Sequence, residues 1–333
     1  MQTNPTITPN KLKQGDEIRI VAPARSLSLL SDETVNFAVE RLESLGFNVT
    51  FSKNCKEIDR YGSSSVKSRV DDLHDAFADR NVKAIFSVIG GFNSNQLLKY
   101  LDYELIKNNP KILCGYSDIT ALANAITAKT GLITYSGLQF STFGMQKEFE
   151  YNLEYFKKCL IEDEEFEVKP SKTWSDDSWY IDQNNRNIMQ NEGYVVFNKG
   201  KAEGTIYGGN LCTLNLLQGT EFMPDISNSI LFLEDDDILE DFSLIEFDRN
   251  LQSIIHLPNF DSVKGIVIGK FQKRSNVDLM ELKEVIMSKE ELKNIPIVAN
   301  ANFGHTNPMF TFPIGGSAKL SVSDEVELKI IRH

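Results

Sequence analysis

The feature that most constrains the fold is a regular alternation of short apolar strands with amphipathic helices in the first half of the chain. A strand is predicted over residues 18–22, a helix over 31–45 that ends at Gly46, and a second strand over 47–51. A strand, a helix and another strand at this spacing form a βαβ unit, in which the two strands run parallel. The sequence therefore predicts an α/β fold built on a parallel sheet.

Two later strands of the same series end in small residues. The predicted strand 84–89 runs into Gly90-Gly91 and then a helix over 97–101, and the apolar run 112–114 ends at Gly115, just before Ser117. Ligands bind at the carboxyl ends of strands in open α/β sheets, and glycine lets the backbone approach a ligand closely. We therefore expect the glycine loop and Ser117 to face one crevice.

Ser117 stands where a strand turns sharply into a helix. At such a corner the serine hydroxyl is exposed, next to backbone N–H groups that no helical carbonyl uses. Nucleophile elbows have this arrangement. Serine is also a common helix N-cap, so the corner alone leaves both interpretations open.

A serine nucleophile needs a general base, and the base needs an acceptor that orients it. Among the four histidines, His305 is the best base, because it lies in a loop rich in glycine and asparagine after a predicted strand. His256 stands at a helix end, where it can complement the helix dipole, and the terminal residue His333 is expected to be mobile.

Glu234 is the best candidate for the orienting group, because it follows the apolar strand 229–233. The alternative for the acidic run 234–237 is a solvated loop. No second cluster of acidic residues or histidines has the spacing of a metal site, so we expect no metal. Ser117, Glu234 and His305 together form a candidate catalytic triad.

Composition excludes several classes of function. The 333 residues carry a net charge of −12, and no basic stripe is present, which argues against a nucleic-acid partner. No apolar run approaches the roughly 20 residues of a membrane span. The segment 1–5 lacks a signal-peptide core and the four cysteines are scattered, so the sequence predicts a cytoplasmic protein with reduced thiols.

The chain divides where its composition changes. Residues 162–200 are polar and irregular and hold both tryptophans, Trp174 and Trp179. We therefore predict an N-terminal domain over 1–165, a connecting loop over 166–200 and a C-terminal domain over 201–333. The last of these ends in a predicted hairpin around residues 323–325.

Six blocks of sequence resemble, in chain order, the LD-carboxypeptidase family of serine peptidases, and together they run from about residue 11 to the end. The blocks are Leu12-Lys13-Gln14-Gly15-Asp16 through Val21-Ala22-Pro23, Gly90-Gly91-Phe92-Asn93-Ser94-Asn95-Gln96-Leu97-Leu98, Gly115-Tyr116-Ser117-Asp118, Gly208-Gly209-Asn210-Leu211, Leu231-Phe232-Leu233-Glu234-Asp235 and Asn302-Phe303-Gly304-His305.

This resemblance implies a Rossmann-like N-terminal domain that carries the serine and a smaller α/β C-terminal domain that carries the glutamate and histidine. It implies Ser117 as nucleophile, His305 as general base and Glu234 as orienting group. The oxyanion hole would be formed by the backbone N–H groups of Asp118 and of the glycine loop at Gly91. The family works without a cofactor, and homodimers are usual.

The family has two branches with different substrates. Muropeptide LD-carboxypeptidases release the terminal D-Ala of cell-wall tetrapeptides, whereas microcin C self-immunity peptidases cut the amide between a peptide or aminoacyl group and a modified nucleotide. The form of the glycine loop and the tryptophan-bearing loop resemble the immunity branch, in which a tryptophan, here Trp174 or Trp179, is expected to stack on adenine. The remaining expected substrate-binding residues are Phe92, Asn93, Ser94 and Asn210.

The prediction is therefore a serine peptidase that acts on a small peptide or an aminoacyl-nucleotide, with the immunity-type reaction first and the muropeptide reaction as the alternative. Asp235, Asp236, Asp237 and Ile238 stand where a basic residue after Glu234 would help to hold a nucleotide. A third possibility is a ligand-binding protein that keeps the scaffold without catalysis.

Overall fold

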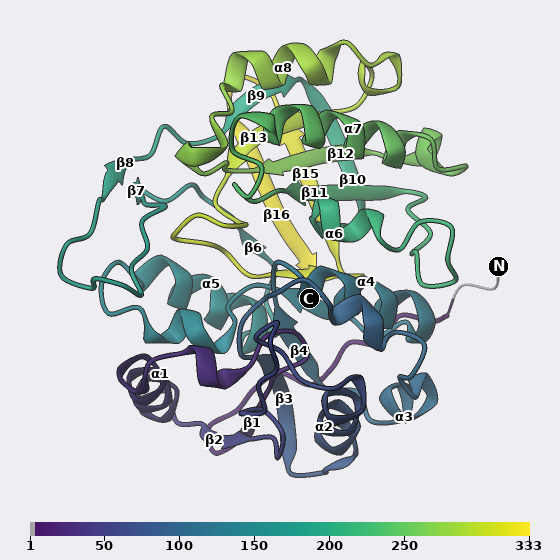
Figure 1. Ribbon diagram of the computed structural model, residues 1–333. Coiled ribbons are helices and arrows are strands. Elements are labelled where there is room, and N and C mark those ends of the chain that lie inside the picture. Colours follow the sequence, from purple (N-terminus) through teal and green to yellow (C-terminus); the bar gives the residue numbers. More distant parts are fainter. Residues whose placement is uncertain (1–3) are drawn as a thin grey trace.

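The computed structural model describes residues 4–333 and contains two large sheets, one in each half of the molecule (Figure 1), and a small two-stranded sheet. Met1, Gln2 and Thr3, which belong to the predicted first domain and to the segment without a signal-peptide core, lie outside the described residues. The N-terminal sheet has the order β14 (Phe312–Ile314), β5 (Thr134–Ser136), β4 (Ile112–Gly115), β3 (Val82–Ser87), β1 (Glu17–Val21) and β2 (Asn48–Phe51).

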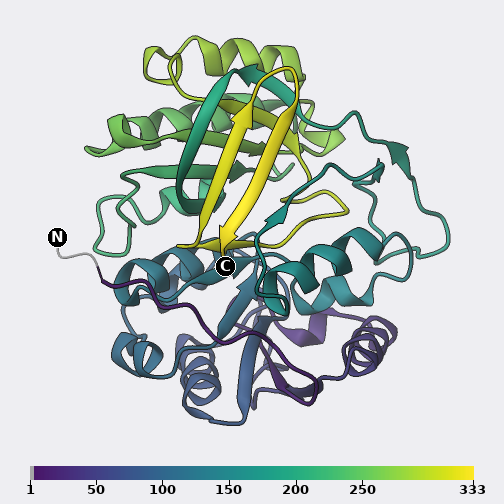
Figure 2. The ribbon, with the colours of Figure 1, turned by 180° about the vertical axis from the view of Figure 1, so that it is seen from behind.

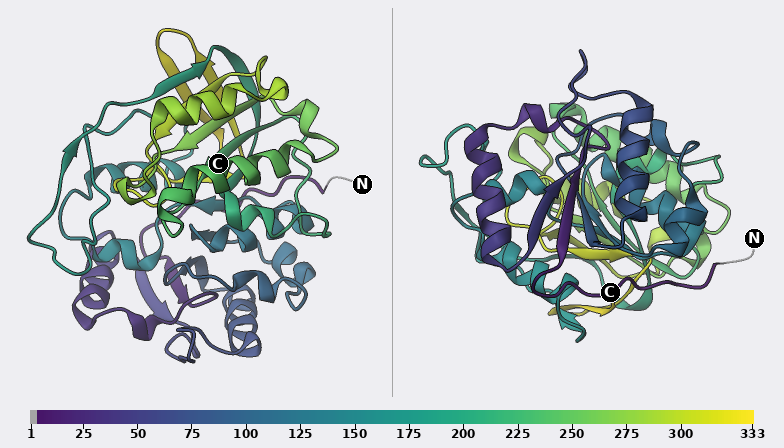
Figure 3. Two further views of the ribbon diagram at one scale, coloured as in Figure 1. Left: turned by 45° about the horizontal axis from the view of Figure 1, so that its top comes forward. Right: turned by 90° about the horizontal axis from the view of Figure 1, so that it is seen from below.

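The N-terminal sheet is parallel from β2 to β5 and is covered on both faces (Figure 3). Side chains alternate between two cores: Ile112 and Cys114 of β4 belong to one, and Leu113 belongs to the other. The first core contains α1 (Asp32–Ser44) and α5 (Glu150–Leu160), and the second contains α2 (Val66–Ala78), α3 (Tyr103–Asn108) and α4 (Ile119–Thr130). Because both faces are buried there, β4 and the inner part of β3 are continuous apolar runs in the sequence, whereas the edge strand β2 is not.

The C-terminal sheet is mixed. Its order is β6 (Phe166–Glu167), β16 (Val326–Arg332), β15 (Ser317–Val322), β10 (Gly200–Asn210), β11 (Ser229–Glu234), β12 (Gly265–Gly269), β13 (Ile297–Ala301) and β9 (Val195–Asn198). Strands β10 to β13 are parallel, and the predicted hairpin is confirmed as β15 and β16, the long yellow pair in Figure 2. The helices here are α6 (Leu211–Asn215), α7 (Ser243–Ile255) and α8 (Leu279–Met287).

The predicted α/β class with two domains and a parallel N-terminal sheet is confirmed, and three details differ. The predicted helix 97–101 is instead a short 3-10 helix over Ser94–Leu97. Strand β14 comes from the C-terminal half of the sequence and pairs antiparallel with β5 of the N-terminal sheet. In the predicted loop 166–200, β6 and β9 form the two edges of the C-terminal sheet, and β7 (Thr173–Trp174) pairs with β8 (Met189–Gln190).

The expectation of a mobile C-terminal residue is wrong. His333 is 5% exposed, and its ring nitrogens lie 2.8 Å from the carbonyl oxygen of Cys159 and 3.1 Å from that of Glu164. These contacts fix the end of β16 against α5, which a count of residues from the terminus cannot reveal. Within residues 4–333, no helix is both long and apolar enough to cross a membrane.

Candidate active site

The Ser117 corner has the backbone of a strained turn and not of a helix cap. Ser117 has a φ of +63°, in the left-handed region that costs a non-glycine residue about 1–3 kcal/mol. Helix α4 begins two residues later, with Asp118 at its N-cap position, so the alternative in which Ser117 is the N-cap is wrong. The turn directs the hydroxyl of Ser117 out of the end of β4, towards the C-terminal half of the molecule.

Three side chains from distant parts of the sequence form a hydrogen-bonded chain at this corner. The Oγ atom of Ser117 lies 3.0 Å from Nε2 of His305, and Nδ1 of His305 lies 2.8 Å from Oε2 of Glu234. Glu234 is the last residue of β11, and His305 lies in the loop after β13. The carboxyl ends of these two parallel strands, which flank β12, therefore deliver the glutamate and the histidine to the serine of the other sheet.

A glycine is required next to the histidine. Gly304 has a φ of +100°, and a Cβ atom placed there would lie 2.5 Å from Oε2 of Glu234. Only glycine combines this backbone with such a close approach to the carboxylate. The carboxylate is itself buried, with 3% of its side chain exposed, so it is held in one position.

Negative charge surrounds the imidazole. Burial lowers the pKa of His305, but the charge and hydrogen bond of Glu234, together with Asp236 and Asp235, outweigh it and raise the pKa to about 9. Burial and the charges of Glu234 and Asp236 raise the pKa of Asp235 to about 7. The alternative of a solvated loop is therefore wrong for the first two residues of the run 234–237, because Glu234 and Asp235 are both buried.

The glycine loop packs directly on the serine. A Cβ atom at Gly90 would lie 2.8 Å from Cβ of Ser117 and 3.6 Å from the backbone nitrogen of Asp118. The buried carboxylate of Asp118 accepts hydrogen bonds from the backbone nitrogens of Asn93 (3.0 Å) and Ser94 (2.9 Å), which ties this loop to the corner. Within residues 4–333, the backbone N–H groups of Gly91 and Asp118 donate to no protein acceptor, so both are available to a ligand.

A cavity of about 630 Å³ opens over the serine and the histidine. It contains Phe92 and Trp179, two of the expected substrate-binding residues. Sequence reasoning missed Arg25, Tyr116 and Tyr180, which also line it. Arg25 follows the carboxyl end of β1, so the rule that ligands bind at strand ends could have found it.

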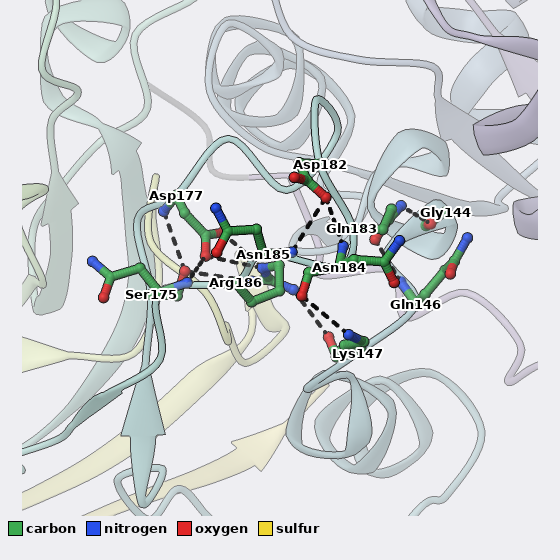
Figure 4. Close-up of polar contacts among 11 residues, drawn as sticks. Gly144, Gln146, Lys147, Ser175, Asp177, Asp182, Gln183, Asn184, Asn185 and Arg186 are labelled. Carbon is green, nitrogen blue, oxygen red and sulfur yellow. Dashed lines mark hydrogen bonds and ion pairs between the residues drawn. The ribbon is translucent and has the colours of Figure 1, made fainter.

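The loop that carries Trp179 is held by buried polar contacts (Figure 4). Nε of Arg186 donates to both carboxylate oxygens of Asp177, at 2.8 and 3.0 Å, and 3% of the Arg186 side chain is exposed. Gln183 donates to the carbonyl oxygen of Gly144 (2.9 Å) and accepts from the backbone nitrogen of Gln146 (3.1 Å). The contact between Arg186 and Asp177 therefore joins two parts of the loop, and the contacts of Gln183 attach the loop to the N-terminal half of the molecule.

Four expected substrate-binding residues do not line the cavity over Ser117. Asn93 and Ser94 hold Asp118, and Asn210 caps α6 and donates to Asp235 at 3.1 Å. Trp174 lies outside the cavity, with its ring centroid 4.5 Å from Nζ of Lys270. The structure thus places only Trp179 in the cavity over Ser117. The sequence alone did not show which of the two tryptophans lies there.

Comparison with known proteins finds two family models in this chain. The LD-carboxypeptidase N-terminal domain matches residues 18–137, and the LD-carboxypeptidase C-terminal domain matches residues 203–320. A crystal structure of an MccF-like protein from Bacillus anthracis is 57% identical with a TM-score of 0.98, and the match covers 98% of this chain and 100% of that one.

Two further relatives carry names that describe a function. The microcin C7 self-immunity protein MccF of Escherichia coli is 34% identical over 91% of this chain and 90% of its own length. A structure of MccF in complex with aspartyl sulfamoyl adenosine has a TM-score of 0.85 at 31% identity and covers 98% of this chain and 99% of its own. A Bacillus subtilis protein named as a probable murein peptide carboxypeptidase is 29% identical over 95% of this chain and 92% of its own.

The matched models account for most of the chain, and they include the corner at Ser117, Glu234 at the end of β11, and His305. The chain therefore belongs to the LD-carboxypeptidase family of serine peptidases.

Proposed function

We propose that this peptidase hydrolyses the amide bond between an aminoacyl or peptidyl group and a modified nucleotide, as an immunity-type enzyme. Oγ of Ser117 attacks the amide carbonyl while Nε2 of His305 accepts its proton. The N–H groups of Asp118 and Gly91 stabilise the oxyanion, and protonated His305 then gives its proton to the leaving nitrogen. Water, activated by the same histidine, hydrolyses the acyl-enzyme and frees Ser117.

The observation that carries this proposal is the position of Trp179, which lines the same cavity as Ser117 and His305. An indole ring that lines the cavity over the proposed nucleophile suits a flat aromatic ligand such as a nucleobase. Arg25 in the same cavity supplies a positive charge for the acidic linkage of such a substrate. The 34% identity to MccF over nearly the whole chain supports the same substrate class.

A second candidate is a muropeptide LD-carboxypeptidase that releases a terminal D-Ala. Asp236, Asp237 and Ile238 line the cavity, so its wall next to Glu234 is acidic and apolar. Such a wall repels a phosphate and suits a substrate ammonium group. The likeness to the murein peptide carboxypeptidase points in the same direction.

Mass spectrometry of the products separates the two candidates. The purified protein is incubated separately with aspartyl sulfamoyl adenosine and with a muropeptide tetrapeptide. Release of aspartate and sulfamoyl adenosine supports the immunity-type reaction, and release of D-Ala alone replaces it with the muropeptide reaction. Cleavage of neither compound contradicts both.

Trp179→Ala is expected to raise KM for the nucleotide amide by about 5- to 150-fold, because stacking of a base on an aromatic ring contributes about 1–3 kcal/mol. Tyr100→Ala, which removes an exposed aromatic ring that does not line the cavity, is the control and should leave KM unchanged. Steady-state kinetics on both substrates measure the effect. An unchanged KM for the nucleotide amide in Trp179→Ala would contradict stacking.

The pH dependence follows from the raised pKa of His305. Below about pH 9 the imidazole is protonated and cannot accept the proton of Ser117. We therefore expect kcat/KM to fall about tenfold for each pH unit below that value and to level off above it. Initial rates between about pH 6 and about pH 10, at low substrate concentration, test this expectation, and a flat profile would contradict it.

We further propose a cytoplasmic homodimer. The four cysteines are free thiols, which suits a reducing compartment. Four apolar residues that lie close together in the sequence are exposed, and the first of them lines the active-site cavity: Ile238, Leu239, Phe242 and Ile245. Exposed apolar patches commonly mark protein interfaces, and a second copy of the chain could cover these residues.

A further inference from the structure

A second cavity, of about 390 Å³, adjoins the one over Ser117. Trp174, Lys270 and Asn300 line it, together with Gln272, which also lines the active-site cavity. Gly269, the residue before Lys270, packs against the triad, since a Cβ atom there would lie 2.7 Å from Cβ of Glu234. We call this second space the Lys270 cavity.

Lys270 is a buried cation whose direct hydrogen-bond partner is neutral, although Glu192, which lines the same cavity, acts on its charge. It is 6% exposed and makes no ion pair within residues 4–333. Its Nζ donates to Oδ1 of Asn300, a neutral amide, and lies 4.5 Å from the centroid of the Trp174 ring. An ammonium group has three N–H donors, and buried charges in proteins are normally paired, so this arrangement leaves room for an anion.

The cation keeps its charge near neutrality. Burial lowers the pKa of Lys270 to about 8, against the opposing effect of Glu192. A group with that pKa is mostly protonated at pH 7.

The charged residues that line the Lys270 cavity indicate which class of anion it can bind. Lys270 and Lys273 line the Lys270 cavity, but so do Glu192 and Asp278, so an ion with two negative charges meets repulsion. A single negative charge, placed beside Lys270 and the amide group of Gln190, matches this lining better. A carboxylate is the common biological group with that charge.

The fold supports a ligand at this place. Lys270 follows the carboxyl end of β12 and Asn300 lies near the end of β13, on the same edge of the C-terminal sheet as Glu234. Ligands of open parallel sheets bind at this edge. The hairpin β7–β8 carries Trp174 into the Lys270 cavity, and the loop between its strands carries Trp179 into the active-site cavity.

We propose that the Lys270 cavity binds a carboxylate group, with Lys270 as the charged anchor, and that it serves the amide hydrolysis at Ser117 as an outer subsite. The role as an outer subsite rests on the proposed function. The binding of a carboxylate at Lys270 does not depend on it. The carboxylate can belong to the substrate or to a separate small acid.

Binding is tested with acetate and with acetamide, which has the same shape and no charge. In a Trp179→Phe chain, Trp174 is the sole indole, and its fluorescence reports on the Lys270 cavity. We expect a saturable change with acetate and none with acetamide. Lys270→Met should weaken acetate binding by at least about tenfold, because hydrogen bonds to charged groups contribute about 1.5–3 kcal/mol.

Lys289→Met is the matched control, because Lys289 is an equally buried lysine that pairs with Asp248 and does not line the Lys270 cavity. It should leave the acetate response intact. Equal responses to acetate and acetamide, or unchanged acetate binding in Lys270→Met, would overturn the proposal. If Lys270→Met does not fold, Lys270→Gln takes its place. The comparison of acetate with acetamide tests the proposal even without a variant of Lys270.

Cleavage assays then identify the source of the carboxylate. A rise in KM with acetate at constant kcat assigns the carboxylate to the substrate, and an unchanged KM assigns it to a separate acid. Because the fluorescence titration needs no turnover, failure of the carboxylate site and failure of the proposed reaction give different results.

Discussion

Ser117→Ala is expected to lower kcat/KM by roughly 10³-fold or more while the protein stays folded. The hydroxyl is the proposed nucleophile, and its hydrogen bond of 3.0 Å to Nε2 of His305 is the proposed route by which its proton leaves. Alanine keeps the cavity and Trp179, so ligand binding should persist. The measurements are steady-state kinetics on the substrate that the parent cleaves and direct titration with that substrate.

The matched control is Ser87→Ala. Ser87 is a buried serine at the end of the neighbouring strand β3, and its hydroxyl has no hydrogen-bond partner within the described residues. Its removal should leave the rate within a few-fold of the parent. A Ser117→Ala variant as active as the parent would show that Ser117 is not the nucleophile. A parent that binds but does not cleave would favour the non-catalytic ligand-binding protein.

The N-terminal half was predictable because its signals are local. Most of its strands contain a short apolar or alternating run, most of its helices have their own start and stop residues, and parallel pairing follows from the helix between two strands. The Ser117 corner is equally local, since a buried strand, a glycine and a helix start lie within ten residues. The predicted strand 112–114 and the observed β4, Ile112–Gly115, accordingly differ by one residue.

Features that depend on distant contacts were not predictable. The pairing of β14 with β5 joins residues far apart in the sequence, and neither strand is longer than three residues. The environment of Trp174 and Trp179 depends on how the hairpin β7–β8 is placed, and their spacing carries no such information. In the sequence, Lys270 resembles an ordinary surface lysine, and only the structure shows that it is buried.

The triad lies between these two cases. Glu234 and His305 were nominated because each follows a predicted strand, which is a local observation. Their hydrogen bond of 2.8 Å is a consequence of how β11 and β13 flank β12, together with the backbone freedom of Gly304. The residues were thus accessible from the sequence, whereas their geometry required the sheet order.

Glu234→Gln is expected to lower kcat by about 10²- to 10⁴-fold with a small effect on KM, because a neutral amide can present an N–H to Nδ1 of His305 and stabilise the wrong tautomer. The variant also removes the charge that raises the pKa of His305. Its residual activity should therefore reach its plateau at a lower pH than the parent. Steady-state kinetics across the same pH range as for the parent measure both effects.

Glu240→Gln makes the same chemical change at an exposed glutamate that pairs with Arg274. Because exposed ion pairs contribute little, we expect a parental rate and pH profile from it. Loss of rate in Glu234→Gln without a shift of the pH profile would mean that Glu234 positions the imidazole but does not set its pKa. A parental rate in that variant would instead remove Glu234 from the triad, since a buried carboxylate 2.8 Å from Nδ1 can serve the reaction only through this contact.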